Sequence, residues 1–473
     1  MISIFGTDGI RGRANQWPIT PDLVLQVGRA VARLFQRELP RRVSHSYKHF
    51  NPYVDDANHP FTVVLGKDTR LSGYMIESAL VAGLVAEGAN VIMLGPIPTP
   101  AIAMLSRSLR ADIGIMISAS HNPYYDNGIK FFDSDGVKFS EEVERNVESI
   151  VENLTKHEQS NQSDTQECGK SMRLDDARGR YVEFAKSTFP SQLSLDGVKI
   201  VLDCANGAAY KVAPRVFWEL GASVITLGDA PNGRNINENC GALHPEAMRK
   251  CVQETGADIG IALDGDADRL LIVTKKGQFV NGDQIIALIA SEWSKGDTTA
   301  GHVSTRLKNG VVTTFMSNLG LKDFLTSLGI PHFEADVGDK NVFKLMRETS
   351  SNLGGEESGH VILNDYTTTG DGIIAALQVL GIVEHHDLDD IFPVFEPYHQ
   401  IIDSFKLDES ITNDVISDLR CNAEEFIGEN GRVVVRKSGT EPLLRVMVQH
   451  KDEQPAMRAF SKLSAALHAH LKT

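Results

Sequence analysis

Short, continuous apolar runs alternate along the chain with longer segments in which apolar residues recur every three or four positions. The clearest run is residues 113–117, Ile-Gly-Ile-Met-Ile, which lacks polar alternation and therefore predicts a strand buried on both faces. Further strands are expected at 61–65 and 91–94, and helices at 21–39, 73–87, 101–109 and 140–154. Strands that alternate with helices predict βαβ units and a mostly parallel sheet.

The buried run ends abruptly in a polar loop, Ser-Ala-Ser-His-Asn-Pro at residues 118–123. Pro123 blocks continuation of the strand, and Asn127-Gly128 predicts a turn before a second strand. Ligands of open α/β sheets bind at the carboxyl ends of strands, so the hydroxyl of Ser120 is a candidate for chemistry. A loop built only from ordinary turn residues is the alternative.

Two segments of this first unit recur later in the chain. Residues 88–95 match 221–228 at six of eight positions, and Ala-Asp-Ile-Gly-Ile occurs at both 111–115 and 257–261. The shared order predicts a duplicated α/β domain, with chance agreement of common apolar residues as the alternative. In the second copy the strand runs into Asp-Gly-Asp-Ala-Asp-Arg at 264–269. The serine loop and the acidic loop would then lie at equivalent strand ends.

A third α/β unit is expected from 277 onward, and the end of the chain changes character. Two alternating strands at 433–436 and 443–448 and an amphipathic helix at 454–471 predict a small α+β domain. The fold class is therefore three similar α/β domains with mixed, mostly parallel sheets and a smaller C-terminal α+β domain, around one central cleft. The expected domains are 1–172, 173–276, 277–390 and 391–473. Residues 40–60 lack periodicity and are interpreted as an exposed insertion.

Composition narrows the class of partner. With 47 Lys and Arg against 62 Asp and Glu, the net charge of −15 argues against nucleic acid. The longest clean apolar stretch, 372–383, is too short to span a bilayer, so no membrane partner is expected. Five scattered cysteines and an amino terminus that reaches glycine and charge too soon for a signal peptide indicate a cytoplasmic protein.

The acidic loop has the chemistry of a cation site. Asp264, Asp266 and Asp268 alternate with small residues, and three close carboxylates repel unless a cation lies among them. Ligation by oxygen alone favours Mg²⁺. An EF-hand is excluded because Arg269 stands where glycine is required and Lys275 where glutamate is required. A solvated acidic turn and an aspartyl-phosphate enzyme are the alternatives.

Two later loops suit a phosphorylated, polyhydroxylated ligand. The turn between the last two strands combines a guanidinium fork, two hydroxyls and a glycine whose backbone N–H is accessible, as a phosphate site requires. Its candidate residues are Arg436, Ser438, Gly439 and Thr440, with Arg445 on the following strand. Glu356, Ser358 and His360 would point the same way if their segment is extended. A basic hairpin turn and an ordinary polar loop are the alternatives.

The four motifs together, in this order, resemble the α-D-phosphohexomutase superfamily over essentially the whole chain. The motifs are residues 118–123, 264–269, 355–360 and 436–442. The opening Phe-Gly-Thr-Asp-Gly-Ile-Arg-Gly at 5–12 and the Ser-Gly-Thr-Glu-Pro loop resemble the bacterial phosphoglucosamine mutase branch. The resemblance implies a phosphoserine at Ser120 and one Mg²⁺ held by that phosphate with Asp264, Asp266 and Asp268.

The resemblance also implies roles for the remaining candidates. Glu356 and Ser358 would contact sugar hydroxyls, and Arg436, Ser438, Gly439 and Thr440 would hold the phosphate that is not transferred. Arg11, Lys130, Arg269 and His360 match positions near the transferred group, with Lys130 and His360 as proton carriers. One departure is Gly-Asp-Lys-Asn at 338–341, where many relatives have Gly-Asp-Arg-Tyr, because Lys340 lacks the bidentate fork of arginine.

The implied reaction is an isomerisation of glucosamine 6-phosphate to glucosamine 1-phosphate through a sugar 1,6-bisphosphate, supplying amino-sugar precursors. Phosphoryl transfer requires charge neutralisation, an in-line nucleophile and positioned donors, and the motifs contain candidates for each. The same chemistry on glucose or mannose phosphates, a non-catalytic sugar-phosphate sensor and a hydrolase are the alternatives. The partner is a small hexosamine phosphate, and a monomer and a homodimer both stay open.

Overall fold

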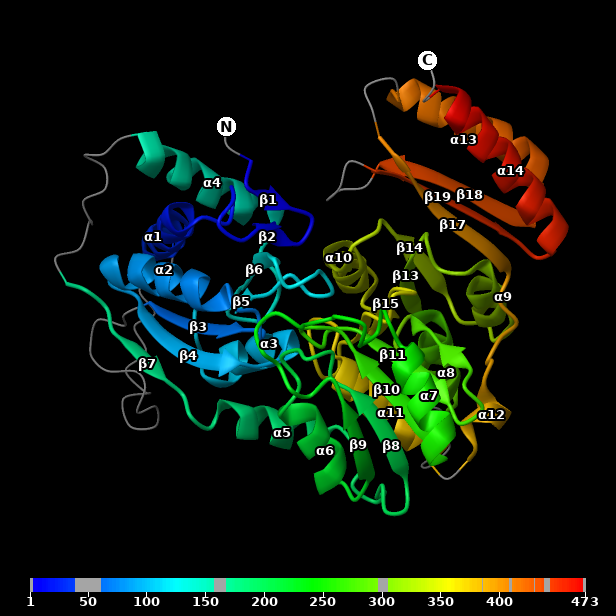
Figure 1. The fold of residues 1–473 in the computed structure, drawn as a ribbon, viewed down its shortest axis with the longest axis horizontal. Coiled ribbons are helices and arrows are strands. Elements are labelled where there is room, and N and C mark those ends of the chain that lie inside the picture. Colours follow the sequence, from blue (N-terminus) through cyan, green and yellow to red (C-terminus); the bar gives the residue numbers. More distant parts are fainter. Residues whose placement is uncertain are drawn as a thin grey trace. The chain divides into compact units, whose positions relative to one another are not determined.

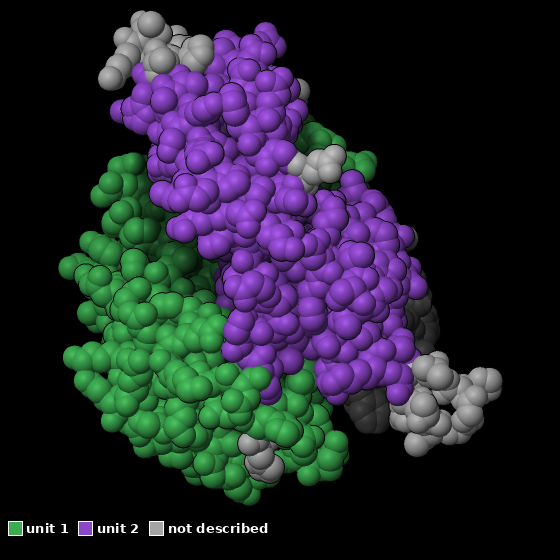
Figure 2. All heavy atoms as spheres, turned by 90° about the vertical axis from the view of Figure 1, so that its right-hand side faces the viewer, with its two compact units in different colours: residues 1–280, 360–390 green, residues 281–359, 391–473 purple. Residues whose placement is uncertain are grey.

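The computed structural model describes residues 3–38, 61–156, 167–296, 305–384, 386–407, 411–428, 430–437 and 443–470. These residues form two compact units, coloured separately in Figure 2. Unit 1 comprises residues 1–280 and 360–390, and unit 2 comprises residues 281–359 and 391–473. The expected insertion at 40–60 lies outside the described residues. Among the described residues, no helix is both long and apolar enough to cross a membrane.

The first sheet of unit 1 has seven strands in the order β1-β2-β6-β5-β3-β4-β7. The strands are β1 (Phe5–Gly6), β2 (Gly9–Arg13), β3 (Thr62–Lys67), β4 (Asn90–Pro96), β5 (Ile113–Ile117), β6 (Asp126–Phe132) and β7 (Ser171–Arg173). Helices α1 (Pro21–Glu38), α2 (Gly73–Ala86) and α4 (Glu141–Lys156) share one core with the sheet (Figure 1). Helix α3 (Thr99–Ser108) packs on β3 and β5, and α5 (Ala177–Ser187) follows β7. Every helix and strand predicted for this region is present.

The turn predicted at Asn127-Gly128 is wrong, because both residues lie within β6. Gly128 pairs with Arg11 of β2, and a Cβ there would lie 2.7 Å from the carbonyl oxygen of Ser118. The glycine therefore allows a close approach of backbones within the sheet. The chain turns earlier, where the amide of Asp126 donates to the carbonyl of Pro123 at 3.2 Å.

The second sheet of unit 1 repeats the first. Its order is β12-β11-β10-β8-β9, formed by β8 (Lys199–Asp203), β9 (Ser223–Leu227), β10 (Ile259–Leu263), β11 (Leu270–Thr274) and β12 (Phe279–Val280). In the first sheet β3 is parallel to its neighbours β4 and β5, and β6 is antiparallel to β5. In the second sheet β8 is likewise parallel to β9 and β10, and β11 is antiparallel to β10. This confirms the predicted duplication. The further elements of unit 1 are α6 (Val212–Glu219), α7 (Glu246–Thr255), α11 (Gly372–Val383) and α12 (Leu388–Ile391), together with β16 (Val361–Leu363), which belongs to neither of these two sheets.

The duplicated glycines have the same conformation in both copies. Gly88 and Gly221, which follow a helix, have φ of 85° and 106°. Gly95 and Gly228, at the strand ends, have φ of 71° and 57°. Residues with a Cβ rarely adopt this left-handed region, so the repeated sequence reflects a repeated backbone.

Unit 2 contains two further sheets. In the first, β13 (Val311–Thr314) is parallel to both β14 (His332–Ala335) and β15 (Leu353–Gly355), with helices α8 (Gly282–Ser294), α9 (Leu319–Ser327) and α10 (Asp339–Thr349). The second is antiparallel in the order β17-β19-β18, formed by β17 (His399–Lys406), β18 (Gly431–Lys437) and β19 (Leu443–His450). Helices α13 (Asn413–Ile427) and α14 (Glu453–His470) share an apolar core with this sheet.

The α+β character predicted for the last segment is confirmed, although β17 and α13 were not predicted. Residues of β18 and β19 alternate between two faces, as in any strand. Val433, Val435 and Val446 belong to the core under the helices. Arg436 and Arg445 occupy the alternate positions and therefore lie on the opposite face, directly across from each other.

Candidate active site

Ser120 lies on the loop that follows β5, where its backbone and side chain are tightly held. Its φ of 52° is left-handed, and only 1% of the residue is exposed. Its amide donates to Ser118 Oγ at 2.9 Å, and its own Oγ donates to Asp264 Oδ2 at 2.6 Å. The loops at the equivalent strand ends of the two repeats are thus joined by a hydrogen bond, which the duplication by itself did not require.

Two residues that the sequence did not single out hold this loop. Arg70 donates from Nη2 to the carbonyls of Ser120 at 2.9 Å and Asn122 at 2.8 Å. Asp68 accepts from Arg70 Nε at 2.8 Å and from Ser118 Oγ at 2.7 Å. Both are 1% exposed. Their position in the sequence could have identified them, because they follow directly after β3, the strand next to β5.

The three aspartates of the acidic loop form one buried cluster. Asp264, Asp266 and Asp268 are 1%, 0% and 3% exposed, and each offers an oxygen within 4.8 Å of the others. Burial, and then repulsion by Asp268 and Asp266, raises the pKa of Asp264 to about 8. Within the described residues, one oxygen of Asp266 and one of Asp268 accept no hydrogen bond. Buried carboxylate oxygens without donors fit a hard divalent cation.

Lys130 projects from β6 into the same cluster. Its Nζ lies 2.8 Å from Asp266 Oδ2, 3.1 Å from Asp268 Oδ2 and 3.5 Å from Asp8 Oδ2. Although burial opposes the charge, these carboxylates raise the pKa of Lys130 well above its ordinary value. Lys130 is therefore an ammonium ion that partly neutralises the aspartates.

Arg11, Arg269 and His360 also lie at this cluster. Arg11 Nη2 donates to Asp8 Oδ2 at 2.6 Å, and Arg269 Nε lies 4.0 Å from Asp268 Oδ1. His360 Nε2 accepts from the amide of Gly370 at 3.0 Å, which places a neutral ring's proton on Nδ1. That Nδ1 lies 3.7 Å from Asp268 Oδ1. Unit 1 thus brings together Ser120 and all of its predicted site residues.

His121 belongs to the serine loop, although the sequence motifs assign it no role. Its Nδ1 lies 3.4 Å from Ser120 Oγ. Burial, followed by the charges of Arg269 and Arg11, lowers the pKa of His121 to about 3. The imidazole is therefore neutral near pH 7 and adds no charge beside the serine. Its position directly after Ser120 in the sequence could have identified it as a site residue.

In unit 2, the segment that contains Glu356 and Ser358 is not extended as assumed. The amide of Gly359 donates to the carbonyl of Glu356 at 3.0 Å, and the φ of Gly359 is 89°. This tight turn removes the alternation on which the expectation of a common direction rested. Glu356 Oε1 accepts from the amide of Gly338 at 3.2 Å, and Ser358 is exposed.

Arg436 and Arg445 form a cationic pair on the face of the sheet that the helices leave uncovered. Burial and the charge of Arg445 lower the pKa of Arg436, while Glu356 acts in the opposite direction. Arg436 therefore lies within electrostatic reach of both residues. Ser438, Gly439 and Thr440 lie outside the described residues.

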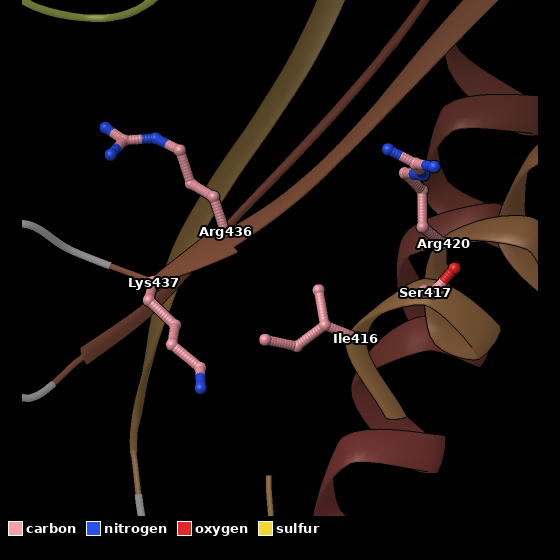
Figure 3. Close-up of a pocket in the computed structure, with 5 residues that line it drawn as sticks. All are labelled: Ile416, Ser417, Arg420, Arg436 and Lys437. Atoms are coloured by element: carbon pink, nitrogen blue, oxygen red, sulfur yellow. The ribbon is translucent and has the colours of Figure 1, made fainter. Parts of the chain in front are cut away.

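A pocket of about 350 Å³ lies beside the end of β18. It is lined by Ile416, Ser417 and Arg420 of α13 with Arg436 and Lys437 (Figure 3). The guanidinium group of Arg436 points away from the three α13 residues in Figure 3. We therefore do not assign the sugar-phosphate function to this pocket.

The fold and these sites define a class of protein. Family models described as phosphoglucomutase/phosphomannomutase match four successive parts of the chain. Alpha/beta/alpha domains I, II and III match residues 3–158, 179–277 and 281–398, and the C-terminal domain matches 405–465. The chain belongs to this family, the α-D-phosphohexomutases.

Curated relatives show which enzymes of this family the chain is similar to. Phosphoglucosamine mutase of Agrobacterium fabrum is 49% identical over 452 residues, which cover 95% of this chain and 94% of that protein. The same enzyme of Phenylobacterium zucineum is 49% identical over 467 residues, 98% of each chain.

Solved structures share the fold. A phosphoglucomutase/phosphomannomutase family protein from Burkholderia thailandensis has a TM-score of 0.79 at 24% identity, covering 99% of this chain and 98% of that one. Aspergillus fumigatus N-acetylphosphoglucosamine mutase, solved with GlcNAc-6P and magnesium, has a TM-score of 0.66 at 17% identity, covering 99% and 96%.

Proposed function

We propose that the chain interconverts glucosamine 6-phosphate and glucosamine 1-phosphate, with Ser120 as the phosphoryl carrier. The observation that carries the proposal is the 2.6 Å contact between Ser120 Oγ and Asp264 within the buried carboxylate cluster. Relatives named phosphoglucosamine mutase, 49% identical over 95% of the chain, support the choice of sugar. A cytoplasmic location is part of the proposal, supported by the free state of all five cysteines.

In the proposed reaction, phosphorylated Ser120 gives its phosphoryl group to the free hydroxyl of the bound sugar phosphate. The bond between phosphorus and Oγ breaks as a bond to the sugar oxygen forms, and the proton lost by the sugar hydroxyl is balanced by the proton that Oγ gains. The product is a sugar 1,6-bisphosphate. The bisphosphate then reverses its orientation, so that its other phosphate faces Ser120. Ser120 Oγ takes that phosphoryl group, which restores the phosphoserine and releases the isomer.

The residues around Ser120 would stabilise the transferred group. We assign charge stabilisation to Arg11 and Arg269, and proton transfer to Lys130 and His360. The charged state of Lys130 suits donation of a proton to an oxygen that gains negative charge. The neutral ring of His121 would lie close to the phosphoryl group without opposing it.

Asp264, Asp266 and Asp268, together with the Ser120 phosphate, would hold one Mg²⁺ per chain. The unsatisfied oxygens of Asp266 and Asp268 support this assignment. When bound, a hard divalent cation neutralises the charge that otherwise opposes in-line transfer of a phosphoryl group.

We assign recognition of the rest of the substrate to unit 2. Glu356 and Ser358 would bind sugar hydroxyls. The phosphate that is not transferred would bind Arg436, Ser438, Gly439, Thr440 and Arg445. Support comes from the position of Arg436 and Arg445 directly across from each other on neighbouring strands, which offers two guanidinium groups to one phosphate.

The test is a mutase assay that compares glucosamine 6-phosphate, glucose 1-phosphate and mannose 1-phosphate, with Mg²⁺ and a trace of sugar bisphosphate. We expect a strong preference for glucosamine 6-phosphate. A preference for glucose or mannose phosphates would contradict the sugar assignment and keep the chemistry. Binding without turnover would favour a sensor, and release of inorganic phosphate would favour a hydrolase.

A further inference from the structure

Glu357 stands between the two proposed sugar ligands, but its carboxylate is occupied by protein groups. Gln400 of β17 donates from Nε2 to both oxygens of Glu357, at 3.2 Å and 3.1 Å. Asn281 Nδ2 lies 3.4 Å from Oε1. The backbone of the turn is held as well, because the amide of Gly282 donates to the carbonyl of Glu357 at 3.0 Å.

The hydrogen bonds continue from Gln400 into the next strand. Gln449 of β19 is fully buried and donates from Nε2 to Gln400 Oε1 at 2.6 Å. The two glutamines are direct cross-strand partners. Gln449 Oε1 in turn accepts from the amide of Leu319, at the start of α9, at 3.1 Å. A chain of hydrogen bonds thus runs from the turn, through two strands, to a backbone amide.

Both ends of this chain fix the direction of the amides. The Glu357 carboxylate only accepts, so Gln400 must present its NH₂ group to it and its oxygen to Gln449. The backbone N–H of Leu319 only donates, so Gln449 must present its oxygen there and its NH₂ group to Gln400. Each side-chain donor therefore meets an acceptor, and neither glutamine can reverse without placing like groups together.

Gln449 and Arg445 lie on the same face of β19, because they are four positions apart and strand side chains alternate. Arg436 lies across from Arg445 on β18. Strand β19, through which the hydrogen-bond chain passes, therefore also carries Arg445, one of the two arginines assigned to the phosphate.

We propose that Glu357 is a positioning residue, which ties the turn bearing Glu356 and Ser358 to the strands bearing Arg436 and Arg445. The inference rests on the proposed function. By fixing the distance between the groups that bind sugar hydroxyls and those that bind the non-transferred phosphate, Glu357 would set the length of sugar phosphate that unit 2 accepts. It would not itself bind the sugar.

The test is a residue swap with four proteins: wild type, Glu357→Gln, Gln400→Glu, and the double variant. Gln400→Glu opposes two carboxylates, and we expect it to weaken glucosamine 6-phosphate binding by about tenfold or more, the value of a lost hydrogen bond to a charged group. Glu357→Gln removes only the charge, and we expect a weakening of about threefold. The double variant restores a carboxylate facing an amide and should bind within about threefold of wild type.

The readout is the dissociation constant of glucosamine 6-phosphate by calorimetry, accompanied by KM and kcat. A positioning role predicts that KM follows the dissociation constant while kcat changes little. Glu348→Gln, an exposed site on α10 of the same unit, is the matched control and should bind normally. Circular dichroism and thermal melting confirm that each variant folds.

The outcomes separate the two proposals. If the double variant binds as weakly as folded Gln400→Glu, Glu357 is not a positioning residue and acts on the sugar itself. If Gln400→Glu binds normally, the hydrogen-bond chain has no role in recognition. A wild type that binds the sugar phosphate without isomerising it would overturn the proposed function, while the binding comparison would still decide the role of Glu357.

Discussion

The candidate residues of the two units lie in contrasting environments. In unit 1, Ser120, Lys130 and the three aspartates are each at most 3% exposed, and most of their contacts join charged groups. In unit 2, Glu356 and Glu357 are half-buried, Ser358 is exposed, and the contacts of Glu357 join a carboxylate to neutral amides. Buried charges interact strongly, whereas exposed groups are screened by water.

This difference matches a division of labour. Phosphoryl transfer depends on electrostatic stabilisation in a site that excludes water, which a buried cluster supplies. A sugar-binding site must let its ligand enter and leave, and side chains that are partly exposed to solvent and bind through hydrogen bonds allow this exchange. Substitutions in unit 1 should therefore act mainly on kcat, and those in unit 2 mainly on KM.

The largest effect is expected for Ser120→Ala. Without its Oγ the protein has no phosphoryl carrier, and turnover should fall by about a thousandfold or more, as when a covalent nucleophile is removed. The substitution also removes the buried hydrogen bond from Oγ to Asp264, so the melting temperature should fall by a few degrees while the fold stays intact. Isomerisation assays with the purified variant test this, and a near-normal rate would remove Ser120 from the mechanism.

Asp266→Asn should have the next largest effect. Removing one ligand charge should lower kcat by about a hundredfold, similar to other losses of electrostatic stabilisation. Mg²⁺ should raise the melting temperature of wild type, because a ligand that binds only the folded state stabilises it, and should raise that of the variant much less. The exposed Asp175→Asn in the same unit serves as the control. Activity that survives chelation would contradict the metal assignment.

Arg436→Ala should act on recognition. Loss of a guanidinium–phosphate contact should raise KM by about ten- to a hundredfold and change kcat far less. Arg420→Ala removes the same charge from the α13 side of the pocket in Figure 3 and should have little effect. Equal effects of the two variants would mean that this pocket, rather than the opposite face of the sheet, binds phosphate.

The smallest effect concerns the pH dependence of stability at Asp283 in unit 2. Burial, and then the charge of Glu357, raises the pKa of Asp283 to about 7, against about 3.9 in an unfolded chain. Between these values the folded state keeps a proton that the unfolded state has lost, so stability falls as pH rises. The slope from this group is at most about 1.4 kcal/mol per pH unit. Denaturation experiments between pH 5 and pH 7 should show that the free energy of unfolding depends less on pH in Asp283→Asn than in wild type.

Local patterns were sufficient for most elements of the fold. The apolar run at β5, its repeat at β10 and the helical periodicity of α1 and α4 all depend on neighbours within a few positions. The predicted turn at Asn127-Gly128 failed because the glycine serves a contact with a distant strand. The extended form assumed for the segment around Ser358 failed because Gly359 permits a tight turn.

The sequence by itself determined the repeated α/β architecture and the order of its chemical motifs, because both are written in residue types and spacing. Only the tertiary structure decided which groups meet. Ser120 and Asp264 are 144 positions apart, and Glu357 and Gln400 are 43 apart. Such contacts depend on how strands stack and on which polar groups burial forces to find partners, and neither is encoded in a local pattern. Arg70 and Gln449 were missed for this reason.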